Sequence, residues 1–193
     1  MSKKVNFVEA IGLGFRNYTK FKGTASRSEF WYWTLFTVLL SMVLGTLESA
    51  IWRPAPTSGD WMEDLTNLAA TPTPLTSIAS IVLFLPNLAV TARRFRDAGF
   101  SAKWLFASIV PGLYAIFALI GVVVIAGGTD VEGGFSTEQW IPVIFLVVPI
   151  FALIAAVAIM FLIFTLKPTR SFYDGNKYAE PQPLSEGDVN TTA

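Results

Sequence analysis

Four basic side chains and a carboxylate lie within residues 93–104, whose sequence is RRFRDAGFSAKW. Guanidinium groups bind phosphate oxygens through paired N–H donors, and a neighbouring carboxylate such as Asp97 can hold them in place. Aromatic residues accompany these charges, as is typical where a protein meets lipid headgroups. The stretch therefore predicts a site for a phosphate or an anionic headgroup. The alternative is a tight turn at Asp97 and Gly99, in which arginine pairs with Asp97 and the basic charge only sets the membrane topology.

Residues of the same chemical types occur in two other polar segments, one near residue 29 and one in the C-terminal tail. In the binding hypothesis, Glu29 and Asp97 orient the arginines. Ser26 and Glu29 also fit a capping box, which predicts a helix start at Arg27 and gives Glu29 an alternative role as a cap. The complete set of candidate binding residues is Arg27, Glu29, Trp31, Arg93, Arg94, Arg96, Asp97, Lys103, Trp104 and Asn176.

The composition excludes several kinds of chemistry. The 193 residues include no cysteine and no histidine, so disulfides, thiol nucleophiles, histidine bases and Cys or His metal sites are ruled out. A non-enzymatic role is favoured over catalysis, and we expect no catalytic residue, no metal and no cofactor. Nucleic acid is not an expected partner.

Long apolar runs must position these polar segments. Hydrophobic residues make up 53% of the chain and charged residues 15%, whereas about a quarter of a typical soluble domain is charged. Four runs reach the roughly 17–25 residues that a helix needs to cross a bilayer. The predicted fold is an all-α integral membrane protein with four transmembrane helices, at about residues 30–51, 75–92, 104–126 and 141–166.

The remaining segments flank this membrane domain, which is expected to cover residues 21–170. Residues 1–20 are expected to form an amphipathic helix that lies in the headgroup layer, because apolar residues recur there at helical spacing. Packing of this helix on the rest of the protein is the alternative. Residues 171–193 are expected to form a cytoplasmic tail with a disordered end.

Pro86, Asn87 and Glu48 are notable among the polar or helix-breaking residues inside the predicted spans. Pro86 removes a helical hydrogen bond, and Asn87 could either satisfy the released carbonyl or bond to a neighbouring helix. A broken helix of this kind can border a transported substrate, while a simple kink is the alternative. Glu48 is expected near the membrane surface, where it could pair with Arg53.

The distribution of basic residues predicts the orientation of the spans. Of the 14 lysine and arginine residues, all but Arg53 lie before residue 30, between residues 93 and 103, or after residue 166. The positive-inside rule then places both termini and the 93–104 loop in the cytoplasm.

Three segments resemble signatures of the bacterial inner-membrane proteins in the "domain of unknown function 805" family. The segments are residues 21–31 (FKGTASRSEFW), 93–104 and 175–179 (GNKYA), and they follow the family's order. Departures are Thr24 for Arg, Arg96 for His, and Ala102 and Ala179 for Gly. The family has no established activity, so the resemblance implies a multi-pass protein of the inner membrane and no mechanism.

These observations predict an inner-membrane protein that acts by interaction through a basic and aromatic cytoplasmic face. Its expected partners are membrane lipids, in particular anionic headgroups, or else a membrane protein or a second copy of the chain. Two alternatives stay open. A transporter or channel component would need a polar path through the spans, and a lipid-modifying enzyme would need clustered carboxylates.

Overall fold

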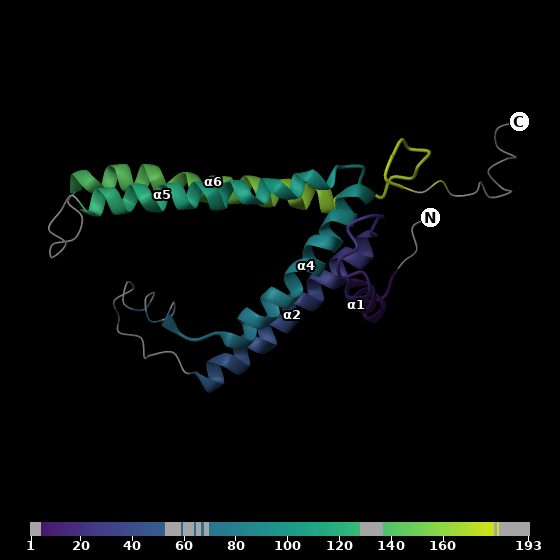
Figure 1. The fold of residues 1–193 in the computed structure, drawn as a ribbon, viewed down its shortest axis with the longest axis horizontal. Helices are drawn as coiled ribbons and strands as arrows, with labels where there is room; N and C mark the ends of the chain where they lie inside the picture. Colours follow the sequence, from purple (N-terminus) through teal and green to yellow (C-terminus); the bar gives the residue numbers. More distant parts are fainter. Residues whose placement is uncertain are drawn as a thin grey trace, which may run out of the picture. The chain divides into compact units, whose positions relative to one another are not determined.

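The computed structural model describes residues 5–52, 70–127 and 137–179, together with residues 59, 64, 67 and 181. Every regular element in these residues is a helix, which confirms the predicted all-α fold. The elements are α1 (Phe7–Arg16), α2 (Arg27–Ile51), α4 (Pro74–Asp97), the 3-10 helix η1 (Ala102–Ser108), α5 (Ile109–Gly127) and α6 (Thr137–Leu166), shown in Figure 1.

Within the described residues, four segments are long and apolar enough to cross a membrane, as the sequence predicts. They are Arg27–Ile51, Pro74–Asp97, Ala102–Ile125 and Glu138–Leu166. The predicted helix start at Arg27 is confirmed, because the Ser26 side chain accepts a hydrogen bond from the Glu29 amide at 3.2 Å. Helix α4 continues past its predicted end at residue 92, so the second signature begins inside a helix.

The third span starts as a 3-10 helix and becomes an α-helix at Ile109. Pro111 contributes to this change, because it has no N–H for the carbonyl of Ala107. Proline is tolerated in the first turn of α5, where amides have no partner within the helix.

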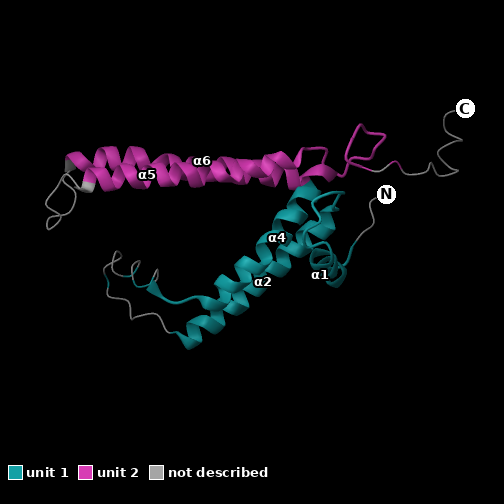
Figure 2. Ribbon diagram, in the orientation of Figure 1, with its two compact units in different colours: residues 1–94 teal, residues 95–193 magenta. Residues whose placement is uncertain are grey.

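The chain divides into two compact units, residues Met1–Arg94 (unit 1) and Phe95–Ala193 (unit 2), which Figure 2 colours separately. In unit 1, α1 packs on α2, and α2 lies beside α4 around a core of Trp33, Leu83 and Val90. In unit 2, α5 lies beside α6. The expected membrane domain of residues 21–170 stays a prediction, and most of the expected disordered end lies outside the described residues.

Helix α1 packs closely on α2. This confirms the alternative prediction that the N-terminal helix packs on the rest of the protein. Gly14 is buried, and a Cβ atom built on it would lie 2.1 Å from ring carbons of Trp33. Phe15 meets the same indole edge-on, with 5.3 Å between ring centroids. The absence of a side chain at residue 14 thus permits the close approach, while placement of α1 in the headgroup layer stays a prediction.

Candidate functional site

A buried ion pair joins the start of α2 to the last turns of α4. Arg93 Nη1 donates to Glu29 Oε1 at 2.8 Å, and the two residues are only 4% and 6% exposed. The backbone is held at the same place, because the Ala25 amide donates to the Arg93 carbonyl at 3.2 Å. Glu29 therefore neutralises a buried arginine. Its negative charge also stabilises α2, because it lies at the positive N-terminal end of the helix dipole.

One hydrogen-bonding edge of the Arg93 guanidinium has no partner in the described part of the chain. Its Nε and Nη2 atoms are buried and donate to no described residue. These two N–H groups form an edge that can bind two oxygens of a carboxylate or phosphate at once. A buried donor without a partner costs about 1–3 kcal/mol, and more when it is charged. This edge therefore offers the donors that an oxyanion binds, while Nη1 of the same guanidinium is paired with Glu29.

Exposed basic and aromatic side chains occur within seven residues of Ala25, whose amide bonds to the Arg93 carbonyl near the end of α4. Each basic residue near a membrane surface adds about 1 kcal/mol of attraction to anionic lipids, and aromatic side chains anchor at the same level. These exposed side chains, which we call the basic surface, are Lys20, Phe21, Lys22, Arg27, Trp31 and Tyr32.

Hydrogen bonds of Asn87 and Tyr18 also hold the helices of unit 1 together. Asn87 Oδ1 accepts a hydrogen bond from Trp33 Nε1 at 2.6 Å, which confirms that Asn87 bonds to a neighbouring helix. Pro86 leaves the carbonyl of Val82 without its usual helical donor. The Tyr18 hydroxyl donates to this carbonyl, so a residue just after α1 satisfies the break in α4.

Glu48 has a role that the sequence did not indicate. This residue is 3% exposed, and its carboxylate accepts hydrogen bonds from the Leu75 and Thr76 amides and from the Thr76 hydroxyl. These amides lie in the first turn of α4, where they have no acceptor in their own helix. Glu48 thus caps α4 from α2 and complements the positive end of its dipole. Its predicted partner Arg53 lies outside the described residues.

In unit 2, the tail closes the C-terminal end of α4. Asn176 Nδ2 donates to the carbonyls of Arg96, Asp97 and Arg170, at 2.9, 3.4 and 3.0 Å. The Arg170 amide donates to the Asp97 carbonyl at 2.9 Å, and the Thr169 hydroxyl donates to Asp97 Oδ2 at 2.6 Å. The last carbonyls of a helix lack intrahelical donors, so the tail supplies the missing ones.

The turn that follows α4 confirms the predicted role of Gly99. Its φ of +86° lies in the left-handed region that favours glycine. The Gly99 amide donates to the Arg96 carbonyl and the Phe100 amide to the Phe95 carbonyl, which is the Schellman pattern of a helix end. Phe95 and Phe100 both pack on Phe164, with centroid distances of 5.3 and 3.9 Å. The two apolar residues of this helix end therefore share Phe164 as a packing partner.

The ten candidate binding residues are divided equally between the two units, so their convergence on one face stays a prediction. Arg94 is fully buried, and Arg96 carries a buried Nη1 without a described partner while its guanidinium lies 5.9 Å from the Tyr178 ring centroid. Lys103 and Trp104 are exposed. Unit 1 contains Arg27, Glu29, Trp31, Arg93 and Arg94, and unit 2 contains Arg96, Asp97, Lys103, Trp104 and Asn176.

Four apolar helices with polar groups gathered at their ends define a multi-pass membrane protein. The family described as "Protein of unknown function (DUF805)" matches residues 18–135, and the chain belongs to this family. The match covers the first two signatures and ends before the third, which contains Asn176.

Curated relatives place the chain among inner-membrane proteins. It is 31% identical to "Inner membrane protein YhaH" of Escherichia coli (strain K12) over 124 residues, which are 64% of this chain and 89% of the relative. It is 25% identical to "Inner membrane protein YhaI" of the same strain over 96 residues, or 50% of this chain and 67% of that relative. No solved structure matches the chain. The protein is thus a multi-pass integral protein of the inner membrane.

Proposed function

We propose that this inner-membrane protein binds the phosphate group of anionic lipids at the end of α2 and α4 where Arg93 lies. The observation that carries the proposal is the buried Nε and Nη2 edge of Arg93, which donates to no described residue. We further propose that this end faces the cytoplasm together with both termini, because it carries most of the basic residues of unit 1.

The chemistry of the site favours a phosphodiester over a cation or a neutral polar group. A guanidinium edge offers only donors, so its partner must supply acceptor oxygens. Glu29 already neutralises Arg93, and the exposed Lys20, Lys22 and Arg27 nearby attract negative charge from the membrane surface. An anionic headgroup satisfies both requirements at once.

Access to the Arg93 edge requires a local movement, because its atoms are buried. The connection between α1 and α2 is exposed at residues 19–24. It is joined to α4 by the backbone bond from Ala25 to Arg93 and by the Tyr18 hydroxyl, which donates to the Val82 carbonyl. Displacement of this connection would open the edge to a headgroup while the Glu29 contact remains. The basic side chains on the same connection would then meet the rest of the headgroup.

Native mass spectrometry of the purified protein with equimolar phosphatidylglycerol and phosphatidylethanolamine tests this proposal. Arg93→Lys keeps a cation for Glu29 but lacks the two-donor edge. Loss of a hydrogen bond to a charged group is worth about 1.5–3 kcal/mol, so preference for the anionic lipid should fall about tenfold or more. Arg16→Lys makes the same chemical change at an exposed position of α1 and should leave the preference unchanged.

Circular dichroism should show the same helix content in both variants, so that a difference in lipid binding does not reflect unfolding. An unchanged preference in Arg93→Lys would contradict the proposal. The buried arginine would then serve helix pairing alone, and the search would move to protein partners of the basic surface.

A further inference from the structure

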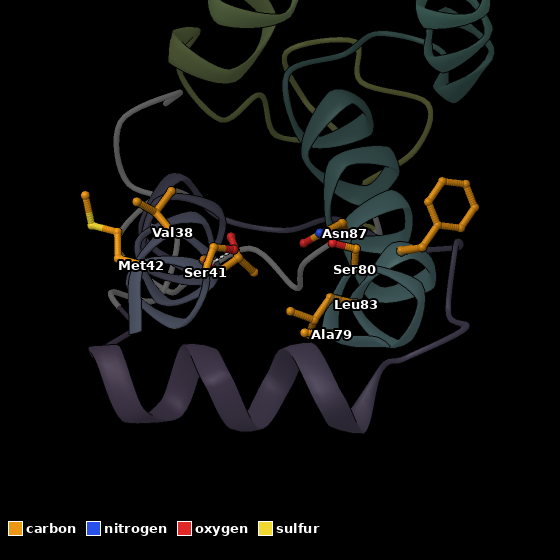
Figure 3. Close-up of a pocket in the computed structure, with 9 residues that line it drawn as sticks. Val38, Ser41, Met42, Ala79, Ser80, Leu83 and Asn87 are labelled. Atoms are coloured by element: carbon orange, nitrogen blue, oxygen red, sulfur yellow. Dashed lines mark hydrogen bonds between the residues drawn. The ribbon is translucent and has the colours of Figure 1, made fainter. Parts of the chain in front are cut away.

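Helices α2 and α4 of unit 1 are separated over part of their length by a groove of about 500 Å³. Figure 3 shows Ser41 of α2, and Ser80 and Asn87 of α4, directed into the space between the helices. Apolar side chains, among them Met42 and Leu83, form the rest of the lining. The groove lies within two membrane spans, so its occupant comes from the bilayer.

The hydroxyl groups of the groove have already used their donors. Thr37 donates to the Thr34 carbonyl at 2.8 Å, Ser41 to the Thr37 carbonyl at 2.9 Å, and Ser80 to the Thr76 carbonyl at 2.8 Å. These hydroxyls can therefore only accept. A polar solute rich in donors and acceptors finds few donors in such a lining.

Asn87 is the residue of the groove that can donate. Its Oδ1 accepts from Trp33, which fixes the amide, and its Nδ2 donates to no residue in the described part of the chain. An amide donor without an acceptor in hydrocarbon costs several kcal/mol. The occupant that matches this groove is therefore mainly apolar and carries an acceptor at one end.

We infer that the groove holds one acyl chain of a membrane glycerolipid, with the ester carbonyl accepting from Asn87 Nδ2. The lining of α4 runs from Ala79 to Asn87, about 12 Å at 1.5 Å per residue, so the groove is elongated and its donor is at one end. That end is nearer to Arg93, which lies about 9 Å farther along the helix. Headgroups and carbonyls occupy roughly 5–8 Å on each side of a bilayer, so Asn87 lies near the depth of an ester.

The groove shares no residue with the proposed headgroup site, and only the depth assigned to Asn87 rests on that proposal. Nothing in the groove carries a charge, so it should hold zwitterionic and anionic lipids alike. A test with zwitterionic lipid alone consequently reports on the groove, and its result does not depend on the outcome for Arg93→Lys.

The test compares two phosphatidylcholines that differ only in their chain linkage, one with ester-linked and one with ether-linked chains. Delipidated protein is mixed with both, and the retained lipid is identified by native mass spectrometry. The ether lipid lacks the carbonyl, so the native protein should retain about three to ten times more ester lipid, the value of one hydrogen bond. Equal retention of the two lipids would overturn the inference.

A groove-filling variant provides the second measurement. Ser80→Leu adds an apolar side chain inside the groove and should abolish retention of the ester lipid. Ser77→Leu makes the same change about one turn earlier on α4, at an exposed position outside the lining, and should leave retention unchanged.

The inference fails if both variants lose the lipid equally or if Ser80→Leu retains it. It also fails if Ser80→Leu converts a dimer to a monomer, because a second copy would then occupy the groove. If Ser80→Leu does not fold, the ester and ether comparison in the native protein still decides.

Discussion

Each unit of this protein contains a pair of apolar helices, but different contacts hold the two pairs. Polar groups link α2 and α4 near both ends and between them, through the Glu48 cap, the Trp33–Asn87 bond and the Glu29–Arg93 ion pair. The α5–α6 pair has no Asp, Glu, Lys or Arg in residues 109–127 or 139–166. Its backbones also approach each other more closely than those of α2 and α4.

This difference shows two ways to pair helices in hydrocarbon. Lipid tails compete with apolar side chains, so association depends on close packing or on interhelical hydrogen bonds. Unit 2 packs closely, with Gly121 against Leu146 and Ala118 only 1% exposed. Unit 1 keeps α2 and α4 farther apart and fixes their register with directional bonds, which leaves room for the groove. We expect the two units to respond differently to loss of a single side chain.

Removal of the Glu29 carboxylate should produce the largest effect. Glu29→Ala leaves Arg93 buried without its counter-charge, which should lower the free energy of unfolding by about 3–5 kcal/mol. Unfolding of the purified protein by sodium dodecyl sulfate in mixed micelles, followed by circular dichroism, measures this loss. Glu138→Ala is the matched control in unit 2, because Glu138 is exposed and should contribute less than about 1 kcal/mol. A similar loss in both variants would break the comparison between the units.

The sequence predicted the helices well because their signals are local. Hydropathy located all four spans, Ser26 and Glu29 marked the start of α2, and Gly99 marked the turn after α4. Each of these features depends on residues only a few positions apart. The end of α4 was missed because the charged residues that follow Ala92 look like a loop, although tail residues distant in sequence satisfy its last carbonyls.

The pairing of polar residues could not be predicted, because it joins segments far apart in the chain. Glu29 was a candidate, but its partner Arg93 is 64 positions away and was one of several arginines that fitted equally. Glu48 gave no signal as a cap, because it binds backbone amides of α4. Asn176 was found through a resemblance, and its partners are again backbone carbonyls, whose positions no residue type reveals.

Close packing of α1 should respond more weakly than the ion pair. Gly14→Ala places a Cβ atom 2.1 Å from the rigid Trp33 ring, so α1 must move away from α2 at a cost of about 1–3 kcal/mol. Gly12→Ala is the control on the same helix, since its Cβ atom meets nothing within 4 Å. That change should leave stability unchanged or raise it by about 0.5–1 kcal/mol through helix propensity.

The matched change in unit 2 sharpens the comparison. Gly121→Ala brings a Cβ atom to 2.7 Å from Leu146 Cδ1, which lies at the end of a flexible side chain and can rotate away. We expect a smaller loss than for Gly14→Ala in the same unfolding assay. A larger loss of stability would mean that the α5–α6 contact tolerates an added methyl group less well than the α1–α2 contact does.

The smallest expected effect concerns the tail of unit 2, outside its spans. The Ser171 hydroxyl and amide donate to Asp174 Oδ2 at 2.7 and 3.0 Å. These bonds, the hydroxyl first, hold the pKa of Asp174 below its ordinary value of 3.8. Because the folded pKa is lowered, the carboxylate supports the turn fully above pH 3.8 and loses this role as the pH falls through the folded value.

A carboxyl NMR titration of the protein in detergent should show the Asp174 midpoint rising toward 3.8 in Ser171→Ala. Ser101→Ala, which removes the cap of η1, should leave that midpoint in place. An unchanged midpoint in Ser171→Ala would show that the hydrogen bonds do not control the pKa. Acid should loosen this turn without disturbing the α5–α6 pair, because residues 139–166 of α6 contain no carboxylate. In unit 1 the corresponding polar contacts lie between the spans themselves. Loss of a carboxylate there must therefore weaken the pairing of α2 with α4.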